Sequence, residues 1–246
     1  MNFLFASDSF KGSLSSVRTA ELLTQAAQEV FPDCSCSWVP MADGGKGTAD
    51  AVIQATGGEW VPVEVCGPLG EPVAAGYGML PGGRCVIEMA SASGLVLVDA
   101  SRRDPRNTST VGTGQLIAAA LKAGCRDIAI AIGGSATNDG GMGCARALGV
   151  RFLDAEGAEL SGKGSDLAKV AKIDASGLMP EAKEAAFTMM SDVDNPLLGP
   201  DGATFTFGPQ KGAVPEIRDE LEAGMANYAA VLKRDLGAET DFPGAG

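Results

Sequence analysis

The chain repeats one arrangement, in which an apolar, strand-like run is followed by a glycine-containing loop and then by helical spacing of apolar residues. The strand-like runs are residues 2–6, 37–40 and 128–132. The helices that follow them are expected at residues 15–31, 48–55 and 141–148. Successive strand–loop–helix units are typical of parallel sheets, because a parallel strand pair needs a crossover that a helix supplies. The sequence therefore predicts an α/β fold with a Rossmann-like parallel-sheet domain.

The pattern changes between residues 59 and 97, where short β-like runs alternate with Gly and Pro. Strand–helix alternation returns after residue 106, and the chain beyond residue 150 mixes short strands and turns with one long helix at 215–236. The Rossmann-like domain is therefore interrupted by a second, mixed α/β domain. We expect the first domain at residues 1–60 and 105–149, and the second at residues 61–104 and 150–246.

The charge balance narrows the range of partners. The net charge is −12 and the isoelectric point is about 4.4, so the mean field repels phosphate backbones and anionic membranes. Aromatic residues make up only 5% of the chain, which leaves few platforms for stacking single-stranded bases. No apolar run approaches the ~18 residues of a membrane span. We therefore expect a cytoplasmic protein with neither a nucleic-acid nor a membrane partner.

Histidine is absent, which excludes Ser-His and Cys-His nucleophile systems and acid–base chemistry that depends on imidazole. The six cysteines lack the C-x-x-C spacing of structural zinc sites, and Cys34-x-Cys36 is their closest pair in sequence. We expect small thiols in a reducing compartment. Catalysis would then depend on carboxylates, Lys, Arg, hydroxyls, thiols, backbone dipoles or a bound metal ion.

The sharpest functional signal is the glycine-rich loop of residues 133–141, GGSATNDGG, between an apolar strand and a helix. Glycines let the backbone approach a ligand closely, and N–H groups at a helix start favour an anion. The alternative is a tight turn with polar caps, but two Gly-Gly pairs exceed what a turn needs. No G-x-x-x-x-G-K-[ST] or G-x-G-x-x-G motif occurs, which disfavours a Walker A loop and an NAD-dependent oxidoreductase. We predict that this loop binds phosphate or nucleotide through Gly133, Gly134, Ser135, Thr137, Asn138 and Asp139.

Two loops near the N-terminus each pair an aspartate with a lysine at the end of a predicted strand. The first contains Asp8, Ser9 and Lys11, and the second contains Asp43 and Lys46. Open α/β sheets place ligands at the carboxyl ends of their strands. A lysine there would neutralise a phosphoryl group, and an aspartate would orient it or hold Mg²⁺. A solvated loop with a surface ion pair explains each segment equally well.

Three further segments supply charged candidates. Asp192 and Asp194 follow a short apolar run, where carboxylates suit Mg²⁺, although an Asx turn before Pro196 explains them as well. Lys211 lies in a glycine loop ahead of the Pro215 helix, where capping is the simpler interpretation. The arginines around Arg103 would bind a carboxylate or line an interdomain hinge.

Seven motifs in collinear order resemble the bacterial type I glycerate kinase family. They are DSFKGS (8–13), ADGGKGT (42–48), RDP (103–105), GGSATNDGG (133–141), SDVDNPL (191–197), FGPQKGA (207–213) and PGAG (243–246). The resemblance implies a Rossmann-like domain with a second α/β domain and an active site between them. It further implies ATP-dependent phosphorylation of D-glycerate with Mg²⁺, with 2-phospho-D-glycerate favoured over the 3-phospho product.

Under this resemblance each candidate residue acquires a role. Lys11 and Lys211 neutralise phosphates, and Asp192, with Asp43 as second candidate, activates the hydroxyl or holds Mg²⁺ together with Asp194. The substrate-binding residues would be Asp8, Ser9 and Arg103. Alternatives are a kinase of another small hydroxy acid or polyol, and a shortened paralogue that binds nucleotide or glycerate without turnover.

The sequence departs from the family pattern at two places. Lys46 stands where the family commonly has Glu, which weakens any acidic role for that position. Family members also continue beyond PGAG with units that complete the Rossmann-like domain. We therefore expect a fragment, a naturally shortened member, or a homodimer that covers the open face.

Overall fold

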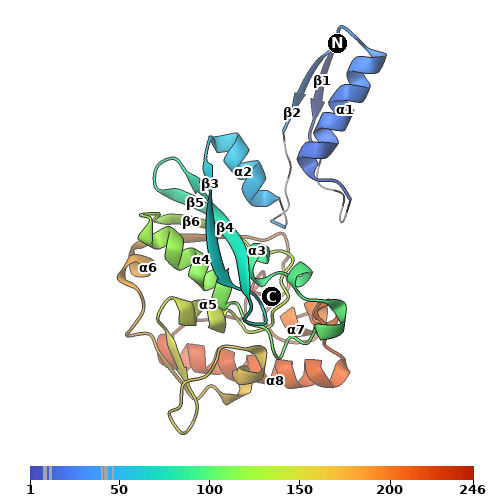
Figure 1. Cartoon of the computed structure of the whole chain (residues 1–246). Helices are drawn as coiled ribbons and strands as arrows, with labels where there is room; N and C mark the ends of the chain where they lie inside the picture. The colour runs from blue at the N-terminus through green and yellow to red at the C-terminus, as the bar shows by residue number, and fades with distance from the viewer. Residues whose placement is uncertain (8–9, 11–12, 40, 42–43, 46) are drawn as a thin grey trace.

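A computed structural model describes the chain except residues 8–9, 11–12, 40, 42–43 and 46. Its centre is a five-stranded mixed sheet in the order β3-β4-β5-β6-β9 (Figure 1). The strands are β3 (Glu59–Cys66), β4 (Pro72–Leu80), β5 (Arg84–Glu88), β6 (Asp127–Ala131) and β9 (Ala186–Met190). The first three are antiparallel, whereas β5, β6 and β9 run parallel to one another. The α/β class expected from the sequence is confirmed.

Helix α4 (Val111–Lys122) makes the crossover from β5 to β6 and provides much of the first core. Its Leu116 and Leu121 are fully buried together with Ile87 and Ile128 of the two strands. Gly112 lets the helix begin against the end of β3, because a Cβ there would lie 1.9 Å from the carbonyl oxygen of Cys66. The burial of apolar side chains between a helix and a sheet is the main favourable contribution to folding in such a layer.

A second core lies under the longest helix, α8 (Pro215–Leu236). Pro215 occupies the first helical turn, and Gly237 adopts φ 68° just beyond its end, as expected for a helix start and stop. Leu221, Met225 and Tyr228 of α8 pack with Phe152. The other elements of this layer are α5 (Met142–Ala147), β7 (Arg151–Leu153), η3 (Gly164–Lys169) and β8 (Lys172–Asp174).

The first three elements form a small unit of their own. Strand β1 (Asn2–Phe5) pairs parallel with β2 (Ser35–Trp38), and α1 (Ser16–Val30) connects them. Figure 1 shows this unit standing apart from the five-stranded sheet. The remaining helices are α2 (Thr48–Thr56), α3 (Ala90–Ser93), η1 (Leu95–Leu97), η2 (Ala100–Arg102), α6 (Pro180–Glu184), α7 (Ala203–Phe207) and η4 (Pro209–Lys211).

The strand pairing differs from the expected domain organisation. The strand expected at 128–132 is β6, and it pairs with β5 at residues 84–88, a range assigned above to the other expected domain. The proposed division of residues 1–60 and 105–149 from residues 61–104 and 150–246 therefore cuts through one continuous sheet. Hydrophobic periodicity identifies strands but does not specify which of them become neighbours.

Within the described part of the chain, no helix has both the length and the apolar character that crossing a bilayer requires.

Candidate active site

The three parallel strands end at one edge of the sheet and bring distant loops together. β5 ends at Glu88, β6 at Ala131 and β9 at Met190. The loops that follow begin the GGSATNDGG segment after β6 and the SDVDNPL segment after β9. Ligands of open α/β sheets bind at this edge. The topology thus places two of the expected motifs side by side.

The first half of the glycine-rich loop contacts two other segments through its backbone. The Gly133 N–H donates to the carbonyl of Gly44 at 3.1 Å, and the Gly134 carbonyl accepts from the Leu95 N–H at 2.8 Å. A Cβ at residue 133 would lie 3.0 Å from the Gly44 oxygen, so glycine permits this approach. Gly134 is exposed and Ser135 is half-buried. A ligand can therefore reach this first part of the loop, and Gly140 and Gly141 at its other end are exposed as well.

Residues 136–139 of the loop are buried and end in a carboxylate enclosed by donors. Asp139, only 2% exposed, accepts from the N–H and hydroxyl of Thr110 at 2.8 and 2.7 Å. It also accepts from the N–H groups of Gly141 and Gly143, both at 3.2 Å. Burial raises the pKa of Asp139, and these donors oppose the rise. Asp139 therefore joins the starts of α4 and α5, and this geometry supports a positioning role rather than phosphate binding.

Lys211 ties the FGPQKGA segment to the glycine-rich loop. Its Nζ donates to the carbonyl of Thr137 at 2.6 Å, and its side chain is 8% exposed. Beside it, Asn138 donates from Nδ2 to the Thr204 hydroxyl at 3.2 Å. Burial lowers the pKa of Lys211 to about 8, and the charge of Asp139 opposes the change. An ammonium has three donors, so Lys211 retains capacity for an anion.

The lowered pKa of Lys211 predicts how stability depends on pH. Between about pH 8 and the ~10.4 of an exposed lysine, the unfolded chain binds a proton that the folded chain has released, so the free energy of unfolding rises with pH. Across that interval, the free energy of unfolding of the wild type should rise by up to roughly 3 kcal/mol relative to that of Lys211→Met. Urea unfolding of both proteins at several pH values measures the difference. A constant difference would show that folding does not lower the pKa of Lys211.

Arg103 lies beside the Lys211 loop. Gly212, at φ 98°, approaches it so closely that a Cβ would lie 2.3 Å from the Arg103 carbonyl oxygen. The half-buried Arg103 donates from Nε to the Val98 carbonyl at 3.4 Å, and no carboxylate among the described residues pairs with it. This leaves a second cation near Lys211 that is available to an anionic ligand.

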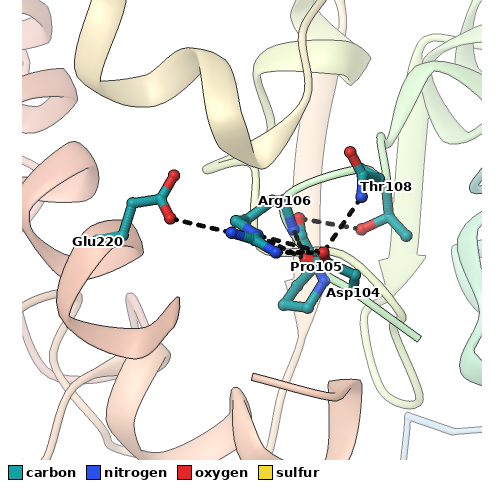
Figure 2. A network of polar contacts seen from close by, with 6 residues as sticks. Asp104, Pro105, Arg106, Thr108 and Glu220 are labelled. Atoms are coloured by element: carbon teal, nitrogen blue, oxygen red, sulfur yellow. Dashed lines mark hydrogen bonds and ion pairs between the residues drawn. The ribbon is translucent and has the colours of Figure 1, made fainter. Parts of the chain in front are cut away.

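The neighbouring Arg106 is committed to a local network, which Figure 2 shows. Its guanidinium binds Asp104 at 2.7 Å and reaches Glu220 at 3.3 Å. The pair lowers the pKa of Asp104, and the Thr108 hydroxyl donates to the Pro105 carbonyl at 3.3 Å. Arg106 therefore fixes the segment after Arg103 rather than serving as a ligand-binding group.

Asp192 and Asp194 follow β9 and are exposed, and no hydrogen bond or ion pair joins either side chain to the described residues. The C-terminal segment lies against the same loop, since the N–H groups of Gly244 and Gly246 donate to the Asn195 carbonyl at 3.1 and 2.9 Å. No group of three or more potential metal ligands occurs among the described residues. Mg²⁺ commonly takes one or two carboxylates plus substrate phosphates, and this pair fits that type.

The remaining predicted residues, Asp8, Ser9, Lys11 and Asp43, lie outside the described residues. Glu88 is a further residue of this edge, not among those predicted. Its carboxylate accepts from the N–H groups of Gly47 and Ala49, both at 2.8 Å, and so anchors the start of α2. The available signal in the sequence was an acidic residue at the end of an apolar strand.

A surface hollow lies beside η3 and α8 and contains none of the predicted residues. It is lined in part by Asp154, Lys169, Asn227 and Arg234.

Known proteins of one family match this chain over almost its whole length. The model of the glycerate kinase family matches residues 3–246. The glycerate kinase of Bacillus subtilis (strain 168) is 47% identical over all of this chain and 65% of its own length, and the glycerate 2-kinase of Escherichia coli (strain K12) is 46% identical with the same coverage.

Among solved structures, one described as a "putative glycerate kinase 2" from Salmonella typhimurium LT2 superposes with a TM-score of 0.89 at 45% identity. That match covers 100% of this chain and 67% of the other. The present chain thus spans about 65% of the length of the curated relatives named above. The sequence match, the family model and the fold all agree, and the chain belongs to the glycerate kinase family.

Proposed function

We propose that this chain carries out, or forms part of a protein that carries out, ATP-dependent phosphorylation of D-glycerate, with 2-phospho-D-glycerate favoured over the 3-phospho product. The observation that carries the proposal is that family motifs from four parts of the sequence gather at one side of the molecule. The Gly44 segment meets Gly133, and Thr137 meets Lys211, which adjoins Arg103 through Gly212. The relatives named as glycerate kinases provide the substrate class.

The proposed reaction is an in-line transfer. The glycerate hydroxyl oxygen forms a bond to the γ-phosphorus of ATP, the bond from that phosphorus to the ADP oxygen breaks, and the hydroxyl proton passes to Asp192. Positioning and charge neutralisation account for most of the catalysis in such transfers. Because the protein as a whole is strongly acidic, the anionic substrates depend on local donors.

Each donor has a proposed target. The Gly134 N–H and the Ser135 hydroxyl would hold ATP phosphate together with Lys211, and Arg103 would bind the glycerate carboxylate. Lys11, Asp43, Asp8 and Ser9 keep the roles that the family resemblance implies. Asp194 would hold Mg²⁺, joined by Asp192 if Asp43 takes the hydroxyl proton instead, and the bound ion neutralises part of the phosphate charge.

Mg²⁺-dependent ADP release by the purified chain tests the proposal, with D-glycerate as acceptor and L-glycerate, glycerol and no acceptor as controls. Turnover that depends on D-glycerate is expected, and phosphorus NMR of the product identifies the phosphorylated hydroxyl. Preference for another acceptor would indicate a kinase of a different hydroxy acid. ATP binding without ADP release for any acceptor would contradict catalysis by this chain alone.

The proposed activity carries two further expectations. Use of ATP and Mg²⁺ suits a cytoplasmic location, which fractionation of the source cells tests. The apolar side chains exposed on the unit formed by β1, α1 and β2, including Leu4, Val30 and Phe31, favour a homodimer if the 246-residue chain exists alone. Sedimentation equilibrium distinguishes that dimer from a monomer.

A further inference from the structure

The N-terminal unit contains a pair of thiols that the proposed kinase reaction does not use. Cys34 lies just before β2 and Cys36 lies within it, so alternation along the strand turns both side chains to the same face. Their Sγ atoms are 3.5 Å apart, and both residues are half-buried free cysteines. This distance exceeds the about 2.05 Å of a disulfide bond, so the pair consists of two thiols held in contact.

The separation of the two sulfur atoms allows both to bond to one soft metal or metalloid atom. Two thiolates at the ~2.3 Å bond length of a zinc–sulfur bond span 3.5 Å when the angle at the central atom is roughly 100°. A zinc ion would need further protein ligands, and no cluster of three or more His, Cys, Asp or Glu residues exists among the described residues. A trivalent arsenic atom with one organic substituent needs only two sulfur ligands.

We propose that Cys34 and Cys36 form a chelating dithiol site for trivalent organoarsenicals. In the binding step both thiols condense with an arsenoxide, R–As=O. In the product the arsenic atom keeps R and is bonded to the sulfur atoms of Cys34 and Cys36. The arsenic–oxygen bonds break, and the two thiol protons leave with that oxygen as water, so no oxidant or reductant is required. Ligands of this class match the preference of thiolates for soft partners.

The other cysteines do not offer an equivalent site. Cys85 and Cys125 also interact, but each is only 1% exposed inside the first core. Cys66 and Cys144 are half-buried, and Cys66 receives a long contact from Gln115. The Cys34–Cys36 pair is therefore the most accessible pair of adjacent thiols among the described residues.

The site lies away from the candidate active site. Cys34 is at the start of β2, whereas the ADGGKGT segment follows the end of that strand. An arsenical bound there would not occupy the sheet edge where the phosphate-binding loops gather. Binding is consequently measured directly rather than through enzyme activity, and its outcome is independent of the proposed function.

The test uses the reduced 246-residue chain and phenylarsine oxide, with intact mass and thiol titration as readouts. We expect one phenylarsenic group per chain, loss of two titratable thiols, persistence in excess 2-mercaptoethanol and reversal by dithiothreitol. Cleavage after Arg18 and Lys46 yields a peptide of residues 19–46 that contains these two cysteines and no others, and the adduct should map to it. An adduct on any other peptide, or no adduct, overturns the proposal.

Variants provide a second, quantitative test. Cys34→Ser and Cys36→Ser should each weaken binding by about 10²–10⁴-fold, because a single thiol loses the effective concentration that the second one supplies. Cys66→Ser, which removes a half-buried thiol outside the pair, should bind like the wild type. Circular dichroism confirms that each variant is folded. Equal binding by the wild type and a folded Cys34→Ser variant would refute the chelate.

Discussion

Replacing Asp192 by Asn is expected to lower kcat by at least ~100-fold while leaving the melting temperature unchanged. A general base contributes about 10²–10⁴-fold to a proton-transfer step, and Asn cannot accept the hydroxyl proton. The carboxylate is exposed and makes no hydrogen bond or ion pair with the described residues, so its loss should remove no stabilising polar interaction. Steady-state ADP release and thermal unfolding monitored by circular dichroism provide the two measurements.

A matched substitution separates this effect from a general loss of negative charge. Asp201→Asn changes another exposed aspartate in the segment that follows, and its kcat should remain close to that of the wild type. Titration with Mg²⁺ then distinguishes the two proposed roles of Asp192. A base variant stays slow at every Mg²⁺ concentration, whereas a metal-ligand variant recovers part of its rate as Mg²⁺ increases. Near-normal turnover of Asp192→Asn would remove both roles.

The sequence predicted the elements best where local chemistry determines their ends. Helix α8 was expected at residues 215–236 and is observed as Pro215–Leu236, because proline starts it and Gly237 stops it. Strand β6, expected at residues 128–132, is observed at Asp127–Ala131, because its run of apolar residues is clear. The meeting of the loops after β6 and β9 at one edge follows from the parallel arrangement of these strands.

Tertiary pairing was not accessible from the same patterns. The sequence places Asp139 in a loop, but the orientation of its side chain depends on a hydrogen bond from Thr110, which lies 29 positions earlier. Likewise, the sequence marks Glu88 only as the last residue of a strand. The structure shows that its carboxylate accepts from the Gly47 N–H at the start of α2. The sequence also did not show that Lys211 is buried. Only the fold shows that its Nζ donates to the Thr137 carbonyl. Orientation and burial are thus set by contacts between segments, which local spacing does not encode.

Replacing Asp139 by Ala is expected to destabilise the fold by roughly 3–5 kcal/mol. The carboxylate receives backbone N–H groups at the starts of both α4 and α5; losing one cap costs about 1 kcal/mol, and each buried donor left unsatisfied costs ~1–3 kcal/mol. At about 2–4 °C per kcal/mol for a chain of this size, the melting temperature should fall by roughly 6–20 °C. Urea unfolding and thermal melts measure the loss.

The control for Asp139 is a carboxylate with similar partners but with access to water. Asp154 accepts from the N–H groups of Glu156 and Ala158 at 3.1 and 2.7 Å in an exposed turn, so water can replace it and Asp154→Ala should cost less than about 1 kcal/mol. Asp139→Asn should fall between the two alanine variants, because it keeps one acceptor oxygen but turns an amide N–H₂ toward other donors. Equal small losses for Asp139→Ala and Asp154→Ala would contradict the positioning role. A large loss confined to Asp139 would instead show that its buried carboxyl group holds the glycine-rich loop in place.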